Sequence, residues 1–90
     1  MKRGLIADPS DNVGVVLETV YPGDSVDFGM VRVTAAAEIH MPGKMALVPI
    51  SAEAPVRKFG GIIGLASRPI QAGEWVHSHN LHSAAKEPIV

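Results

Sequence analysis

Glycine and proline interrupt this sequence too often for long helices. Nine glycines and seven prolines are spread over 90 residues, and a proline inside a helix removes a backbone hydrogen bond and clashes with the preceding turn. Valine, isoleucine and leucine supply most of the apolar residues between these breaks, and branched apolar residues favour strands. The sequence therefore predicts an all-β fold of short twisted strands joined by tight turns.

The size of the chain indicates one domain over residues 1–90. Two independent hydrophobic cores need more chain than this. With 47% apolar and 19% charged residues, the composition is that of a folded domain. Only four residues are aromatic, two Phe, one Tyr and one Trp, so the core is thin, and small domains with thin cores often depend on a partner.

Charge and composition exclude several functional classes. Eight Lys and Arg are scattered among nine Asp and Glu, whereas nucleic-acid binding requires clustered positive charge. The chain has no cysteine, which excludes disulfides, thiolate metal sites and a Cys nucleophile. Its apolar runs are far shorter than the ~20 residues of a bilayer span. We expect a cytoplasmic protein that binds neither nucleic acid nor membrane.

Turn signals divide the chain into expected strands. Pro-Gly pairs end strands after Tyr21 and Met41, and Gly60-Gly61 is expected to form a two-residue hairpin turn. A helical turn is possible only at Ala35, and an exposed polar tail begins near Ser83. The expected strands cover residues 4–7, 13–20, 26–34, 44–50, 56–59, 62–66 and 75–78.

One spacing recurs three times along the chain. It reads Val16-x3-Val20-x2-Gly23-x2-Val26, then Ala46-x3-Ile50-x2-Glu53-x2-Val56, then Ala66-x3-Ile70-x2-Gly73-x2-Val76. A strand, a turn and the start of the next strand produce this spacing. Because the intervals between copies are unequal, the pattern is not a solenoid array. We interpret it as a repeated corner in an irregular β fold.

A histidine pair near the C-terminus is the densest polar group in the sequence. His77 and His79 share one face if residues 75–79 are extended. Two imidazoles on one face can ligate a divalent metal or act as acid and base. A complete metal site would need further ligands, from Asp11, Glu38, His40 or another chain.

Other candidates are dispersed. Asp11 and Asn12 lie in a turn before a strand, where an Asp commonly bonds its own backbone. Lys44, Arg57 and Lys58 are cations that could bind a substrate carboxylate. The sequence contains no nucleophile elbow, P-loop, dinucleotide fingerprint or EF-hand pattern.

Together, several segments resemble the SAF-type domain of the altronate and galactarate dehydratases, the UxaA-like hydrolase family. The resemblance covers about residues 11–81, with a short C-terminal tail at 82–90. The segments that carry it are Asp11-Asn12-Val13, Ala46-Leu47, Val56-Arg57-Lys58-Phe59-Gly60, Ile63-Gly64 and Ala72-Gly73-Glu74-Trp75-Val76-His77-Ser78-His79-Asn80-Leu81.

This resemblance implies a β-clip fold with a long bent hairpin. It also implies a sugar-acid hydro-lyase that converts an aldonate or aldarate to a 2-keto-3-deoxy acid. In longer relatives the domain precedes a much larger catalytic region. The resemblance therefore implies a small subunit that is inactive without a large catalytic partner, with homo-oligomerisation also open.

The resemblance also implies roles for particular residues. His77 and His79 match the His-x-His-Asn ending of the family and are expected in the active site, as catalytic groups or as ligands of a divalent metal. That metal is commonly iron(II) in the family, held here mainly by the large subunit. Asn80 is expected to orient an imidazole or contact a substrate hydroxyl. Substrate binding is also expected of Asp11, Asn12, Lys44 and Lys58.

Two departures and two alternatives accompany this expectation. Relatives usually have Gly-His-Lys where this chain has Pro42-Gly43-Lys44, and often a histidine at the position of Trp75. His40 is a weak substitute for the missing histidine. The alternatives are the small subunit of a sulfolactate sulfo-lyase, in which sulfite leaves instead of water, and a non-catalytic module that binds a sugar acid.

Overall fold

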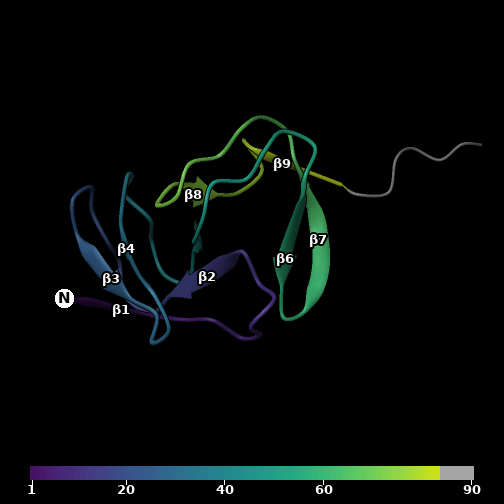
Figure 1. The fold of residues 1–90 in the computed structure, drawn as a ribbon. Helices are drawn as coiled ribbons and strands as arrows, with labels where there is room; N and C mark the ends of the chain where they lie inside the picture. The colour runs from purple at the N-terminus through teal and green to yellow at the C-terminus, as the bar shows by residue number, and fades with distance from the viewer. Residues whose placement is uncertain (84–90) are drawn as a thin grey trace, which may run out of the picture.

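The computed structural model describes residues 1–83, and within them the fold is all-β, as the sequence predicts (Figure 1). The strands are β1 (Lys2–Leu5), β2 (Val13–Val16), β3 (Ser25–Asp27), β4 (Arg32–Thr34), β5 (Lys44–Ala46), β6 (Pro55–Lys58), β7 (Gly61–Ala66), β8 (Trp75–Val76) and β9 (Leu81–His82). No helix long and apolar enough to cross a membrane occurs in residues 1–83.

The strands form a curled mixed sheet and a smaller antiparallel one. The larger sheet has the order β4-β3-β1-β2-β5-β8, and the smaller has the order β6-β7-β9. The one parallel pair among the described strands is β1 with β3, in the larger sheet, where Lys2 lies opposite Val26. All other pairs are antiparallel. In Figure 1, β3 and β4 lie at the opposite end of the ribbon from the β6–β7 hairpin.

The repeated spacing marks the same corner three times, which confirms the sequence interpretation. The third named position of the spacing has a positive φ in each copy, with values of 92° at Gly23, 66° at Glu53 and 91° at Gly73. Its N–H donates to a carbonyl of another segment in each copy, from Gly23 to Ala35 (2.8 Å), from Glu53 to Ala66 (2.7 Å) and from Gly73 to Ala46 (2.8 Å). Each corner therefore both reverses the chain and joins it to a second strand.

The core consists of two hydrophobic clusters, one built around the first corner and the other around the second and third. The first, from the N-terminal half, consists of Val16, Val20, Val26, Phe28, Val33, Ala35, Ile39 and Met45. The second consists of Val13, Ala46, Ile50, Val56, Ala66, Ile70 and Val76. Nine of these fifteen residues belong to the three copies of the repeated spacing. The same pattern that makes the corners therefore also supplies most of the core.

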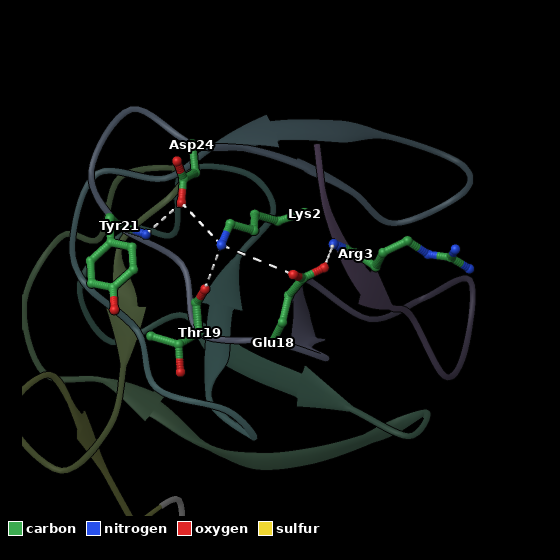
Figure 2. A network of polar contacts seen from close by, with 6 residues as sticks. All are labelled: Lys2, Arg3, Glu18, Thr19, Tyr21 and Asp24. Carbon is green, nitrogen blue, oxygen red and sulfur yellow. Dashed lines mark hydrogen bonds and ion pairs between the residues drawn. The ribbon is translucent and has the colours of Figure 1, made fainter.

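A polar network joins the N-terminal strand to the first corner (Figure 2). The ammonium of Lys2 donates to the Thr19 carbonyl at 3.1 Å and lies 4.0 Å from both Glu18 and Asp24. Asp24 in turn accepts the N–H of Tyr21 at 2.8 Å. The network supports the parallel pairing of β1 with β3, which has only a short ladder of its own.

Several sequence expectations are wrong in detail. Residues 26–34 form not one strand but the β3–β4 hairpin, because Gly29 adopts a φ of 93° and donates its N–H to Asp27 at 2.8 Å. The strand expected over 13–20 ends at Val16, and no helical turn forms after Ala35.

At the C-terminal end, the hairpin turn consists of Phe59 and Gly60, one residue earlier than expected. His82, assigned to the tail from sequence, belongs to β9 and pairs with Leu65. The remainder of the expected tail, residues 84–90, lies outside the described residues.

Two glycine substitutions test the corners. A Cβ at Gly23 meets no atom within 4 Å, whereas a Cβ at Gly73 lies 2.2 Å from the Thr34 carbonyl oxygen. Gly23→Ala should therefore lower the free energy of unfolding by about 1 kcal/mol, the cost of a side chain at positive φ. Gly73→Ala should lower it by more than about 3 kcal/mol or prevent folding. Urea unfolding followed by tryptophan fluorescence measures both, and equal costs would contradict the corner geometry.

Candidate functional site

The histidine pair gathers around Trp75. The imidazole of His77 stacks on the Trp75 indole with a centroid distance of 5.0 Å and an interplanar angle of 8°. The His79 ring also lies 5.0 Å from Trp75, tilted by 38°. Both histidines are exposed, and Trp75 is 37% exposed. The chain thus presents two imidazoles on one aromatic platform, open to solvent or to a partner.

A buried asparagine holds this platform. The chain is not extended through residue 79, because it turns after β8 and the Asn80 N–H donates to the His77 carbonyl at 3.0 Å. The fully buried Asn80 side chain accepts the His77 N–H and donates to the Trp75 carbonyl, both at 2.9 Å. Asn80 therefore fixes the backbone that carries Trp75 and His77, and in this geometry its amide makes backbone contacts and no contact with an imidazole.

Gly43 and Trp75, the two positions at which the resemblance predicts a departure from the family pattern, lie next to each other. A Cβ built at Gly43 is 3.6 Å from the Trp75 indole nitrogen. It also comes within 2.4 Å of Ile39 Cγ2 and 2.7 Å of the His40 carbonyl oxygen. Position 43 therefore has no room for a histidine in this backbone. His40 instead makes an exposed ion pair with Glu38, with its Nε2 2.8 Å from the carboxylate.

Lys44 and Lys58 form a second group. Lys44 pairs with Val76 and Met45 with Trp75 across β5 and β8. Since side chains alternate between the faces of a strand, Lys44 projects from the opposite sheet face to Trp75. Partial burial, followed by repulsion from Lys58, lowers the pKa of Lys44. Neither lysine has a carboxylate partner within residues 1–83.

Asp11 and Asn12 hold the β6–β7 hairpin. The Asp11 carboxylate accepts the N–H groups of Phe59 (2.9 Å), Gly60 (2.8 Å) and Asp8 (3.1 Å). The Asn12 amide accepts the Arg57 N–H at 2.7 Å and donates to the Pro55 carbonyl at 2.9 Å. Asp11 thus bonds the local backbone at Asp8, as its place in a turn predicts. Its other hydrogen bonds, and those of Asn12, reach backbone groups more than forty residues away in the sequence. A substrate-binding role for these two side chains stays a prediction.

A third metal ligand does not join the histidine pair. Within residues 1–83 no three His, Asp or Glu side chains come together as a metal site requires. Asp11, Glu38 and His40 therefore do not complete one with His77 and His79. The donor set of the described residues does not by itself fit iron(II), since a protein metal site usually uses three or more ligands.

Sequence reasoning missed the contribution of Trp75 to this site. From sequence Trp75 is only the replacement of a family histidine, whereas in the structure both imidazole rings lie against its indole. The contact of His82 Nε2 with the Glu53 carboxylate, 3.2 Å apart, was also missed. No local sequence signal indicates that contact, because it joins β9 to a corner 29 residues away.

Comparison with known proteins identifies the family. Residues 2–84 match the altronate/galactarate dehydratase SAF domain. The chain belongs to this family. It is also similar to altronate dehydratase of Escherichia coli (strain K12), with 39% identity over 70 residues, or 78% of this chain. The match spans only 14% of that enzyme, so this SAF domain corresponds to a small segment of a larger dehydratase.

Substitution of Asn80 tests how the platform is held. Asn80→Ala leaves the His77 N–H and the Trp75 carbonyl without their partner, and should lower the free energy of unfolding by about 2 kcal/mol. Because Trp75 is the only tryptophan, its fluorescence should change in the folded variant. The control, His79→Ala, removes an exposed side chain and should cost less than about 0.5 kcal/mol. Equal stability of the Asn80 variant and the native chain would contradict this role.

Titration of Lys44 tests the lysine group. By NMR of the lysine side chains, Lys44 should titrate below its ordinary value of 10.5. Lys58→Gln should raise its pKa only in part, because burial is the larger cause. Between the lowered pKa and 10.5 the unfolded chain binds more protons, so the free energy of unfolding should rise with pH. That rise should shrink in Lys58→Gln, and an unchanged Lys44 titration would show that the two ammonium groups do not interact.

Proposed function

We propose that this chain is the small subunit of a sugar-acid hydro-lyase. It would act with a separate large catalytic subunit on an aldonate or aldarate and yield a 2-keto-3-deoxy acid. Membership of the dehydratase SAF family and the match to a short segment of altronate dehydratase support this role. The observation that carries it is the exposed pair of imidazoles on Trp75.

The proposed reaction needs groups that this chain can supply. Elimination of water removes a proton from the carbon next to the carboxylate and breaks the C–O bond of the neighbouring carbon. The resulting enol then becomes the ketone. A base takes the proton and an acid delivers one to the leaving hydroxyl. Imidazole changes charge near neutral pH and suits either task, so we assign these proton transfers to His77 and His79.

A divalent metal, when bound, would stabilise the enolate charge. In our proposal its ligands come mainly from the large subunit, since the described residues contribute two imidazoles and no third ligand. Lys44 and Lys58 are two cations without carboxylate partners and are proposed to attract the acid substrate. Asn80 acts by positioning His77 and Trp75.

Replacement of the histidine pair tests the proposal. In the complex of this chain with the large subunit, His77→Ala with His79→Ala should lower kcat by about 10²- to 10⁴-fold, the usual contribution of acid–base groups. The melting temperature should be unchanged because both side chains are exposed. His40→Ala, which removes another exposed histidine, is the matched control and should retain full turnover.

The assay uses a panel of aldonates and aldarates together with sulfolactate. Unchanged turnover in the double variant would remove the site assignment. Release of sulfite from sulfolactate, with no dehydration of sugar acids, would replace the hydro-lyase with a sulfo-lyase. Binding of a sugar acid without turnover in any complex would leave a non-catalytic binding module.

A further inference from the structure

The β6–β7 hairpin extends from the core as an arm with an apolar tip. Its base is buried, since Val56 and Ala66 are 0% exposed. Towards the turn the exposure rises to 66% for Phe59, 49% for Ile62 and 40% for Ile63. Figure 1 shows this hairpin at one end of the ribbon. Three large apolar side chains thus gather on a projecting element, an arrangement typical of an interaction surface.

Two irregularities of the backbone present these side chains. Phe59 adopts a φ of 56°, a conformation that is strained for an aromatic residue and that glycine adopts freely. Along β7, Val56 lies opposite Gly64 and Arg57 opposite Ile62, so Ile63 is an extra residue in a β-bulge. A bulge breaks the alternation of side chains, and here both isoleucines are exposed.

The strained tip is held rigidly. The Asp11 carboxylate, 9% exposed, accepts the N–H groups of both turn residues, Phe59 and Gly60. The Lys58 ammonium lies 4.9 Å from the centroid of the Phe59 ring. A buried carboxylate therefore holds the backbone of Phe59, which carries an exposed phenyl ring, in an unfavourable conformation. Such strain is maintained by the surrounding structure and commonly marks a functional element.

We infer that this arm docks into an apolar pocket on the catalytic subunit of the dehydratase, with Phe59 as the anchor and Ile62 and Ile63 around it. The inference rests on the proposed function. The similar segment is 14% of altronate dehydratase, so in that protein the corresponding segment belongs to the same chain as a much larger remainder. Aromatic anchors with apolar neighbours carry much of the binding free energy at interfaces.

Charge indicates the rim of that pocket. Arg57 and Lys58 lie on β6 directly before the tip and have no carboxylate partner within residues 1–83. The Asp8 carboxylate lies beside Gly60, 3.3 Å from the position of a Cβ there, and its pKa is lowered by hydrogen bonds from Ser10. The two cations without carboxylate partners thus lie on the β6 side of the tip, and the Asp8 carboxylate lies beside Gly60. A partner whose pocket carries carboxylates facing β6 would complement Arg57 and Lys58.

The test is the dissociation constant of this chain with the dehydratase large subunit from the same organism, measured by calorimetry, together with turnover of the complex. Phe59→Gly removes the phenyl ring and fits the positive φ, so the variant should fold. We expect binding to weaken by about tenfold to a hundredfold. Met30→Ser is the matched control, because Met30 is 72% exposed at the tip of the β3–β4 hairpin, and it should bind normally.

The outcomes separate the inference from the proposed function. If the native chain neither binds nor activates the large subunit, the proposed function fails and the docking surface with it. If the native chain and Phe59→Gly bind and activate equally, only the docking surface is overturned. A dimer of this chain that Phe59→Gly dissociates would assign the arm to a second copy instead.

The stability of the isolated chain gives an independent check. Because Phe59 is exposed and strained, Phe59→Gly should leave the melting temperature unchanged or raise it. A lower melting temperature would mean that another part of this chain covers the tip, and would overturn the inference.

Discussion

Three backbone N–H groups, each at a residue with positive φ, connect the segments of this protein. At Gly23, Glu53 and Gly73 the chain reverses, and the N–H of the reversing residue donates to a carbonyl of a distant segment. The apolar residues on both sides of each corner enter the core. In each corner, the residue that makes the local turn also makes the long-range hydrogen bond. Strands of only two to six residues are therefore joined into sheets without supporting helices in the described part of the chain.

The middle corner differs from the others in a way that links it to the C-terminal strand. Gly23 and Gly73 are free to adopt positive φ, whereas Glu53 adopts it at a cost. The Glu53 side chain lies 3.2 Å from His82 of β9, which pairs with β7. The strained residue thus contacts the strand that completes the smaller sheet.

Sequence reasoning succeeded where the signal is local or repeated. The all-β class, the corners and the β6–β7 hairpin follow from glycine, proline and branched residues at fixed spacing. It failed at residues 26–34, where apolar residues on both sides conceal the turn that Gly29 makes. Sequence does not distinguish an apolar residue in a turn from one in a buried strand. Met30 is such a residue, because it lies in the β3–β4 turn and is 72% exposed.

The candidate site was predictable in its residues and less so in their roles. Sequence located His77, His79 and Asn80, because they lie close together in the chain. It could not show that the Asn80 amide binds the backbone, nor that Asp11 supports a hairpin tip 48 residues away. Such roles depend on hydrogen bonds across the fold, and a polar side chain offers the same donors and acceptors to a backbone as to a ligand.

Gly43 and Trp75, the two positions at which the resemblance predicts a departure from the family pattern, are neighbours in space, because a Cβ at position 43 would lie 3.6 Å from the indole nitrogen. With no side chain at position 43, the indole can lie beside that backbone, and with Ile39 and the His40 carbonyl close by, a histidine there has no space. The indole in turn supports His77 and His79. Trp75 thus gives the two imidazoles a common aromatic surface. The proposed function assigns proton transfer to these two histidines, and within residues 1–83 no third His, Asp or Glu side chain joins them to hold a metal.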